Sequence, residues 1–518
     1  MADENQPLLR KKKPLNTLDI PHSGPSSIAA VNLPDEAAGN SAKSFGAVGV
    51  DLFIDSIPVI LSYILQNSIQ AISVLIVGRL GPDELSAAAL AIMFAFVTGM
   101  CIALGGTTAL DTLASQAFTG GTKPSDVSIH FQRCVIVLWA LFIPVSALWI
   151  RARPVLLLLG QGERVSEDVQ TYLRVFLFGA PGYIAFESLK KYLQCQGIMR
   201  ASTIALVLVA PVNIALNIIL IHYTPLGFLG SPVAVAITYW LCFFVLIILT
   251  YISPTFHRNK TWEGLQLRAV LDPRSCWEFI KLAVPGIFMV GTEWTAFQIV
   301  ALAAGRLGAI PLAAQAVIMT TDEVLNSIPF GIGIAASTRV GNLIGARAAY
   351  DAKRASHAAA LVSVIIGSIV MASMLAAKNV YGYMFSDDEA VVHLVSQVLP
   401  LVASFQIADG LAGSCGGVLR GQGRQHLGAM FNLVAYYVLA LPLGITLAFH
   451  PRTHRGLEGL WIGQVVALFI VGIGEYGTVW LATDWDKEVQ KGIERNEAEA
   501  KRRALYERAL PSAESEIA

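Results

Sequence analysis

About twelve long apolar runs follow one another along the chain, and they constrain its fold more than any other feature. A helix needs about 20 mostly apolar residues to cross the hydrocarbon core of a bilayer. Prolines interrupt several runs, which membrane helices tolerate where neighbouring helices satisfy the freed backbone groups. The sequence therefore predicts an all-α membrane protein with about 12 transmembrane helices. The approximate limits of the runs are 52–78, 87–110, 129–150, 168–193, 202–222, 231–252, 276–303, 312–336, 356–377, 390–416, 427–449 and 459–482.

The composition agrees with a chain that exposes little surface to water. Charged residues make up 14% of the 518 residues, against about a quarter in a typical soluble domain. The net charge is +0, so the chain lacks the basic surface that nucleic-acid binding requires. The six cysteines are scattered without paired spacing. They are expected to be small buried side chains, and no metal or other cofactor is predicted.

The two halves of the chain repeat each other. The segment "GRLGPDELSAAAL" from Gly78 matches "GRLGAIPLAAQAV" from Gly305 at an offset of 227 residues. Matches in near-constant register indicate a duplicated unit of six helices. Because six is even, both copies enter the membrane from the same side, which predicts two lobes related by a pseudo-twofold axis along the membrane normal. Further matches are Asp111–Gln116 with Ser337–Asn342 and Leu193–Gly197 with Leu419–Gly423 at 226, and Gly227 and Gly230 with Gly456 and Gly459 at 229.

The repeat divides the chain into five parts. Residues 1–48 are polar and predict a disordered tail, because they cannot bury a core. The first lobe is expected at 49–255 and the second at 276–483, with a linker at 256–275 between them. Residues 484–518 are rich in Glu, Lys and Arg and predict a charged tail that can form a solvated helix.

Basic residues predict how the chain sits in the membrane. With the N-terminal tail and its lysines at 11–13 in the cytosol, the loops on that side carry sixteen Lys and Arg residues and the opposite loops eight. Positive residues concentrate on the cytosolic side, so both termini are expected there. An acidic dileucine pattern at Glu4–Leu9 favours an endosomal or vacuolar membrane, and the plasma membrane is the alternative.

Acids inside the apolar runs are the main candidates for binding a coupling ion, because a carboxylate within the membrane is costly and usually functional. Glu293 lies in the middle of the seventh run, beside Trp294 and one turn from Phe297. In an apolar wall a carboxyl group accepts a proton more readily than in water. When it is ionised, it can attract a cationic substrate that also contacts the two aromatic rings. Asp409 in the tenth run is the second candidate.

The repeat partners of these two acids are uncharged. The offset of 227 aligns Glu293 with Gln66, and the offset of 226 aligns Asp409 with Tyr183. This difference predicts that the second lobe couples transport to an ion, while the first lobe contributes neutral polar groups. The alternative for each acid is a structural hydrogen bond to a neighbouring helix.

Three further acids are less clearly assigned. Asp322 and Glu323 are adjacent, so their side chains diverge by about 100° on a helix and only one is expected to face the cavity. A hydrogen-bonding role for the pair is an equal alternative. Glu187 precedes Lys190 and Lys191 by three and four residues, a spacing that predicts a local ion pair rather than a transport role.

Neutral polar residues complete the expected sites. The predicted substrate cavity combines side chains of both lobes, although polar contacts between helices would explain the asparagines equally well. Polar residues at the cytosolic ends of the second and eighth runs, and in two turns, are expected to fix the inner loops and close a cytosolic gate. The cavity candidates are Gln66, Asn67, Trp294, Phe297, Tyr183, Asn213 and Asn217, and the gate candidates are Asp111, Gln116, Arg339, Asn342, Gln196 and Gln422.

Five segments resemble the MATE (multidrug and toxic compound extrusion) family of eukaryotic transporters, over residues 50–482 and in family order. The resemblance is to the fungal branch, and it implies an antiporter that expels organic cations, drugs or metabolites in exchange for protons. It also implies that Glu293 matches an acid assigned to proton coupling and that an acid is expected at Asp409. The segments are "GRLGPDELSAAALA", "ALDTLASQAFTGG", "TEWTAFQ", "IPFGIGIAASTRVGNLIGA" and "DGLAGSCGGVLRGQGRQ".

Transport driven by an ion gradient is therefore the predicted function. The chain contains no GxxxxGK[ST] motif for an ATP-driven motor and no nucleophile or metal motif of an enzyme. Protons are the expected coupling ion, sodium is the alternative, and a monomer is expected. A lipid or lipid-linked sugar flippase is the rival function. It would require basic side chains in the cavity for phosphate, and few Lys or Arg lie within the runs.

Overall fold

The computed structural model describes residues 43–508, and every regular element in that range is helical. Two short helices, α13 (Pro254–Asn259) and α14 (Leu267–Val270), separate the halves, and α23 (Trp485–Arg508) ends the described range. The first half comprises α3 (Phe45–Val77), α4 (Pro82–Ala95), η2 (Phe96–Met100), α5 (Cys101–Gly106), α6 (Thr108–Gly120), α7 (Asp126–Ile150), α8 (Ala152–Leu158), α9 (Glu163–Phe176), α10 (Ala180–Gln194), α11 (Arg200–His222), η3 (Gly227–Leu229) and α12 (Gly230–Ile252). The second half comprises α15 (Pro273–Leu307), α16 (Ala309–Leu325), α17 (Ser327–Gly345), α18 (Ala349–Ala377), η4 (Tyr381–Met384), α19 (Glu389–Gln422), α20 (Gln425–Asn432), η5 (Leu433–Ala440), α21 (Leu441–Phe449) and α22 (Gly456–Leu481).

The first membrane helix begins slightly earlier than the predicted end of the N-terminal tail. Helix α3 starts at Phe45, where the side chain of Ser44 accepts a hydrogen bond from the backbone of Ala47. A serine in this position caps the first turn of a helix. The rest of the predicted tail, with the lysines at 11–13 and the pattern at Glu4–Leu9, lies outside the described residues.

Ten helical segments within residues 43–508 are long and apolar enough to cross a membrane. The two other predicted spans, at 168–193 and 312–336, are each divided between two consecutive helices: α9 and α10, and α16 and α17. A proline ring clashes with the carbonyl group four residues earlier, which is at Leu177 for Pro181 and at Leu325 for Pro329. The helices preceding these prolines end at Phe176 and Leu325, whereas Pro58, Pro144 and Pro285 lie inside continuous helices. A proline therefore accompanies both breaks but does not by itself predict which spans are divided.

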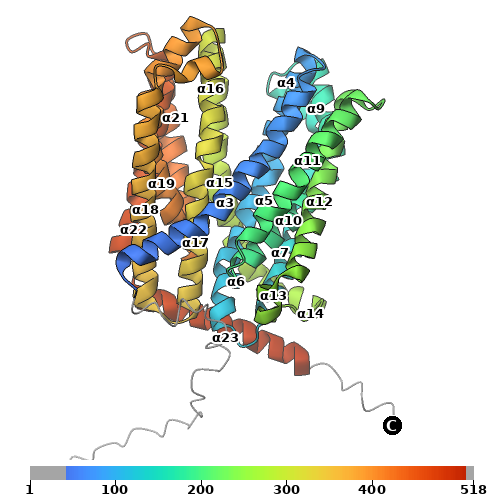
Figure 1. Ribbon diagram of the computed structural model, residues 1–518, viewed down its shortest axis with the longest axis vertical. Helices are drawn as coiled ribbons and strands as arrows, with labels where there is room; N and C mark the ends of the chain where they lie inside the picture. The colour runs from blue at the N-terminus through green and yellow to red at the C-terminus, as the bar shows by residue number, and fades with distance from the viewer. Residues whose placement is uncertain (1–42, 509–518) are drawn as a thin grey trace, which may run out of the picture.

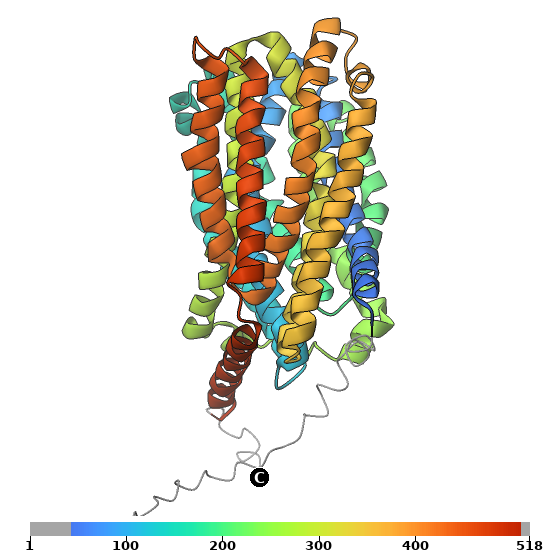
Figure 2. The same ribbon diagram turned by 90° about the vertical axis from the view of Figure 1, so that its left-hand side faces the viewer.

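The spans form two lobes. Most helices of the first half, in blue to green, lie on one side of Figure 1, and those of the second half, in yellow to red, lie on the other; the blue helix α3 crosses from one side to the other, and its start packs against α17 and α18. The two halves diverge with distance from α23, and Figure 2 shows the second lobe from its outer side. The structure is thus an all-α membrane protein with twelve spans in two lobes, as the sequence predicts.

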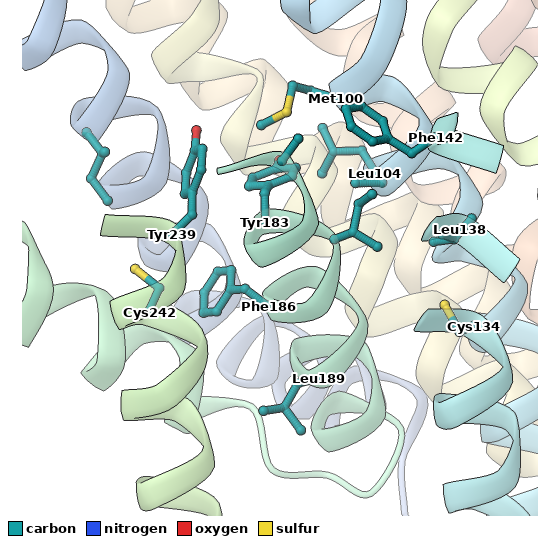
Figure 3. Packing of buried hydrophobic residues seen from close by; sticks show 14 of the residues in the cluster. Met100, Leu104, Cys134, Leu138, Phe142, Tyr183, Phe186, Leu189, Tyr239 and Cys242 are labelled. Atoms are coloured by element: carbon teal, nitrogen blue, oxygen red, sulfur yellow. The ribbon is translucent and has the colours of Figure 1, made fainter. Parts of the chain in front are cut away.

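Each lobe has its own apolar core. Figure 3 shows part of the first core, where Leu104, Leu138 and Phe142 from successive spans pack near Tyr183 and Phe186 of α10. The second core is built around α15, α19 and α22. A third cluster joins the start of α3 to α17 and α18 of the opposite lobe. The first core also includes Phe279 and Val290 of α15 and Ile334 of α17, so the two lobes also pack against each other in a shared contact region.

This contact region lies at the end of the molecule near α23, called here the α23 end. The hydroxyl groups of Thr112 and Thr119 on α6 donate hydrogen bonds to the carbonyl oxygens of Arg420 (2.5 Å) and Asn342 (2.6 Å) in the second lobe. Between them, the side-chain amide of Gln116 donates to the carbonyl oxygen of Gly421 at 2.9 Å. These bonds fasten the two lobes together at the α23 end.

Helix α23 crosses this end and contacts both lobes (Figure 1). Arg495 donates hydrogen bonds to the side-chain oxygen of Gln116 in the first lobe and to the carbonyl oxygen of Gln422 in the second, both at 3.2 Å. Trp485 and Glu488 at its start are buried. The predicted helix in the charged tail is present, but it is not surrounded by water, because its inner face packs against the loops of the lobes.

Candidate functional site

A small polar cavity of about 50 Å³ lies inside the second lobe. Helices α15, α17, α19, α20 and α22 enclose it. The side-chain amide of Asn432 on α20 fixes one wall by donating a hydrogen bond to the carbonyl oxygen of Met289 at 2.7 Å. The cavity unites both acids that the sequence places first. Its polar lining residues are Glu293, Asn326, Asp409, Arg420, Asn432 and Glu475.

Glu293 is half-buried and lines the cavity. The Tyr436 hydroxyl donates to its Oε1 at 3.5 Å, a long hydrogen bond. The neighbouring ring of Trp294 lies 4.9 Å from the ring of Phe96 in the first lobe. The carboxyl group is thus placed where it can respond to both lobes.

Asp409 is deeper, with 3% of its surface exposed. Asn326, in the break between α16 and α17, donates a hydrogen bond to its Oδ2 at 3.3 Å. Among the described residues, no Lys or Arg lies within ion-pair distance of Asp409 or Glu293. Neutral donors alone hold the two carboxyl groups, so neither has a fixed counter-charge.

The adjacent acids of α16 point in different directions, as their spacing predicts. Asp322 is buried and accepts a hydrogen bond from the side-chain amide of Gln406 at 3.4 Å. Glu323 is exposed, and its carbonyl oxygen accepts a hydrogen bond from the exposed side chain of Asn67 in the first lobe at 3.4 Å. Of this pair, Glu323 therefore lies on the surface between the lobes and Asp322 lies within the second lobe.

The corresponding region of the first lobe contains a complete ion pair. The Lys190 ammonium donates to Glu187 at 2.7 Å and to Gln66 at 3.0 Å, and it lies 4.0 Å from the centre of the Tyr63 ring. Gln66 also donates to the hydroxyl of Tyr183 at 2.9 Å. The spacing of Glu187 and Lys190 correctly predicts this pair, and both side chains are fully buried.

Three other cavity candidates lie inside their lobes. Asn213 and Asn217 are completely buried on α11, where Asn213 donates to the hydroxyl of Thr238 at 2.9 Å and Asn217 donates to the carbonyl oxygen of Asn213 at 2.9 Å. The ring of Phe297 is also buried, among the aromatic rings of the second core. Of the predicted cavity residues, Asn67 and Trp294 lie nearest the surface between the lobes.

The gate candidates divide into two groups. Gln116 and Asn342 take part directly in the inter-lobe contact, where the side-chain amide of Asn342 donates to the carbonyl oxygen of Cys195 at 3.1 Å. Gln422 is buried, and its carbonyl oxygen accepts a hydrogen bond from Arg495 of α23. Gln196 instead binds the linker, where it accepts a hydrogen bond from Thr261 at 2.9 Å.

Arg339 lies beside two acids on the first turns of α3. Its guanidinium is 3.8 Å from Asp51 and 4.0 Å from Asp55. Since α3 belongs to the first lobe and Arg339 to the second, this contact also connects the lobes.

Asp111 connects the lobes through two cations. It is buried on α6, and the Lys191 ammonium of its own lobe lies 2.8 Å from Oδ1. The Arg420 guanidinium of the second lobe lies 3.5 Å from Oδ2. One carboxylate of the first lobe thus faces one cation from each lobe.

Sequence reasoning missed several buried charges. Sequence reasoning did not anticipate the burial of Lys190, Lys191 and Arg420, which lie near the ends of their helices and are at most 5% exposed. Their apparent position near span ends concealed how deeply the loops bury them. Glu475 was also missed, although an acid inside the last apolar run is the same signal that identifies Glu293. Both Glu475 oxygens are buried without a hydrogen-bond partner among the described residues.

Fold and site together define a two-lobe, multi-pass integral membrane protein with ionisable side chains enclosed by its spans. Each six-helix half matches the MatE family model, over residues 58–219 and 285–446. An uncharacterized transporter of Schizosaccharomyces pombe is 35% identical over 90% of this chain and 86% of its own length. Multidrug and toxin extrusion protein 1 of Homo sapiens is 33% identical over 84% of this chain and 75% of its own.

A solved structure agrees with these relatives. The crystal structure of the eukaryotic MATE transporter AtDTX14 superposes with a TM-score of 0.79 at 30% identity, covering 87% of this chain and 99% of that one. The chain therefore belongs to the MatE family of membrane transporters. The fungal affinity expected from the sequence agrees with an identity of 39% to a second S. pombe transporter.

Proposed function

We propose that this protein exports organic cations, drugs or other xenobiotics across a membrane in exchange for protons, by alternating access. The observation that carries the proposal is the difference between the lobes. Glu187 in the first lobe has the permanent partner Lys190, whereas Glu293 and Asp409 in the second have only neutral donors. Carboxylates without a fixed counter-charge inside a membrane protein can exchange a bound proton for a cationic substrate.

The proposed orientation places the α23 end in the cytosol, where the basic loops belong. The fastened end of the two lobes then faces the cytosol, and the diverging end in Figure 1 faces the opposite compartment. The substrate would bind between the lobes near Glu293 and Trp294. Protonation of Glu293 or Asp409 would remove the attraction for a cation and release it.

The relatives support the class of substrate. Two of them carry the name multidrug and toxin extrusion protein, which favours organic cations and drugs over lipids. The buried basic residues do not favour a phosphate-binding cavity, because each lies beside an acid: Lys190 beside Glu187, and Lys191 and Arg420 beside Asp111. Proton and substrate compete in this scheme, so each weakens binding of the other by the same factor.

The test uses purified protein in liposomes and a fluorescent organic cation. Uptake is measured under a proton gradient and, separately, under a sodium gradient of equal size. We expect accumulation with the proton gradient in the wild type and at least about a fivefold loss in Glu293→Gln and in Asp409→Asn, the lower range of coupling between linked sites. Accumulation with sodium alone, or full activity in both variants, would contradict proton coupling through these acids.

A further inference from the structure

The cluster of Asp111, Lys191 and Arg420 at the inter-lobe contact contains more positive than negative charge unless a second acid contributes. Asp111 is a single carboxylate, and it faces both Lys191 and Arg420. All three side chains are almost completely buried. An uncompensated charge in such surroundings is strongly destabilising. A second carboxylate near one of the cations is therefore needed to balance this contact.

Glu475 is the acid that lies near Arg420 at the small cavity. Its carboxylate and the Arg420 guanidinium approach the same point on α19, since a methyl group at Gly416 would lie 3.3 Å from Oε2 of Glu475 and 3.7 Å from Nη1 of Arg420. Both residues line the small cavity. Arg420 also has a buried Nη2 atom without a hydrogen-bond acceptor among the described residues. Arg420 therefore lies between the cavity and the inter-lobe contact.

The repeat shows how the second lobe makes room for this cavity. The offset of 226 aligns Lys190 with Gly416, and the offset of 229 aligns Leu246 with Glu475. In the first lobe, the ammonium group of Lys190 is held by Glu187 at the position that Gly416 has in the second lobe. The fully buried Leu246 packs where the second lobe has Glu475. In the second lobe, glycine in place of lysine leaves space, and glutamate in place of leucine adds a carboxyl group that can bind a proton.

Other charged and titratable groups around Glu475 are few. On the helices packed against α22, those that line the cavity or contact its acids are Asp409, Arg420, Glu293 and Tyr436. Cys415 is buried on the same helix as Arg420. On α20 and α16, which also pack against α22, His426 and Glu323 are exposed, and Asp322 accepts a hydrogen bond from Gln406. Arg420 is therefore the one cation of the described residues that borders this cavity.

We propose that Glu475 is a further proton-binding group, and that its protonation loosens the contact between the lobes at the α23 end. With Glu475 ionised, Arg420 and Lys191 are balanced by Asp111 and Glu475. A proton on Glu475 leaves two cations, one on each lobe, against a single carboxylate, and their repulsion favours separation of the lobes. This inference rests on the proposed exchange of protons for substrate, and it supplies the step that links proton binding to movement.

The experiment measures the separation of the lobes directly. Spin labels at Arg200 and Tyr350, exposed residues of opposite lobes, report the distance across the α23 end in full-length protein with its native cysteines replaced. We expect acidification to shift the wild-type distances to longer values. Glu475→Gln should give the longer distances at all pH values, and Glu475→Asp should restore the response. The matched control is Glu458→Gln, which removes a half-exposed acid from the same helix.

The outcomes separate this inference from the proposed function. If Glu475→Gln keeps the wild-type pH response of the distances while Glu293→Gln loses proton-driven uptake, Glu475 is not the proton-binding group and the transport proposal stands. If the wild type shows no proton-driven uptake, the transport proposal fails, whatever the labels report. Thermal unfolding of each variant verifies folding, and a folded Glu475→Gln variant whose distances respond to pH like those of the wild type overturns the role of Glu475.

Discussion

Glu187 and Glu475 are both completely buried, but they differ in their partners. Lys190 follows Glu187 by three residues on the same helix, so the sequence alone predicts the pair. The cation nearest to the cavity of Glu475 is Arg420, on another helix, and no local spacing reveals it. Intramembrane acids can therefore be found from sequence, but their counter-charges can be predicted only where they lie on the same helix.

Removing only one partner of the pair of Glu187 and Lys190 should reduce stability much more than removing both charges. Lys190→Met keeps the length of the side chain but leaves Glu187 buried without its cation, which should cost about 3–5 kcal/mol. The double variant Glu187→Gln/Lys190→Met removes both charges and should recover most of this loss. Thermal unfolding in detergent, followed by tryptophan fluorescence, measures the differences.

Lys281→Met is the matched control for this prediction. Lys281 also pairs with an acid three residues away, Glu278, but about half of each side chain is exposed. Exposed pairs contribute about 0–1 kcal/mol, so this variant should unfold close to the wild-type temperature. Equal losses in Lys190→Met and Lys281→Met would show that burial does not strengthen the first pair.

At the scale of helices, most of the fold could be predicted. The lengths of the apolar runs account for the spans. Pro181 and Pro329 stand at the two divided spans, but Pro58 and Pro285 lie inside continuous helices, so the divisions could not be predicted from proline alone. The place of α23 could not be predicted, because its partners are far away in the chain. Glu499, for example, pairs with Arg133 at 2.7 Å, across 366 positions. Its high charge resembles that of a solvated helix until the loops that receive it are known.

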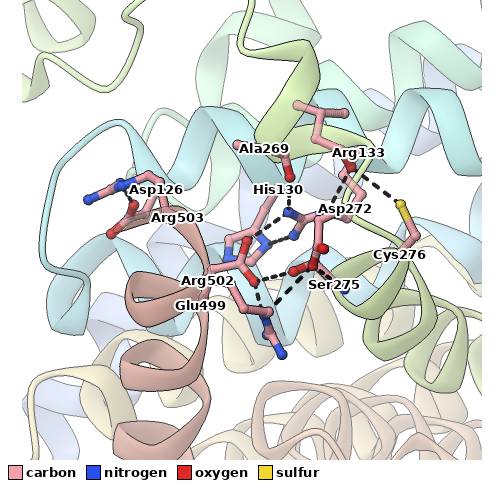
Figure 4. A network of polar contacts seen from close by, with 11 residues as sticks. Asp126, His130, Arg133, Ala269, Asp272, Ser275, Cys276, Glu499, Arg502 and Arg503 are labelled. Atoms are coloured by element: carbon pink, nitrogen blue, oxygen red, sulfur yellow. Dashed lines mark hydrogen bonds and ion pairs between the residues drawn. The ribbon is translucent and has the colours of Figure 1, made fainter. Parts of the chain in front are cut away.

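Glu499 makes the docking of α23 dependent on pH (Figure 4). Burial alone would raise the pKa of Glu499, but His130 and Arg133 beside it, and hydrogen bonds from Arg133 and Ser275, lower the pKa from 4.5 to about 2. A carboxyl group whose pKa is lower in the folded state stabilises that state above its unfolded pKa. The contribution should be complete above about pH 4.5 and lost as the pH falls towards about 2.

Hydrogen exchange of the α23 backbone measures this effect. Protection should decrease over that acidic range in the wild type, whereas Glu499→Gln should show weaker protection at neutral pH and a smaller decrease on acidification. Glu494→Gln is the control, since Glu494 lies on the same helix and its interaction with Gln490 is exposed. A wild-type profile in Glu499→Gln would show that other contacts hold α23.

At the scale of the whole molecule, α23 joins two lobes that also pack against each other through α3, α5 and α6 of the first and α15, α17 and α18 of the second. Arg495 binds Gln116 of the first lobe and Gln422 of the second, beside the contact that Arg420 and Asp111 form. Separation of the lobes at this end must therefore break the hydrogen bonds of Arg495 to at least one lobe. Helix α23 should stabilise the conformation in which the α23 end is closed.

Arg495→Ala should consequently shift the lobes towards separation at the α23 end. Each hydrogen bond from a charged donor contributes about 1.5–3 kcal/mol, so the loss of one should change the ratio of closed to open molecules by about tenfold or more. The spin-label distances between Arg200 and Tyr350 measure that ratio, and Lys487→Ala, at an exposed position of α23, is the control. If Arg495→Ala left the distances unchanged, α23 would be a passive cover, and the closed end would depend on the contacts between the lobes alone.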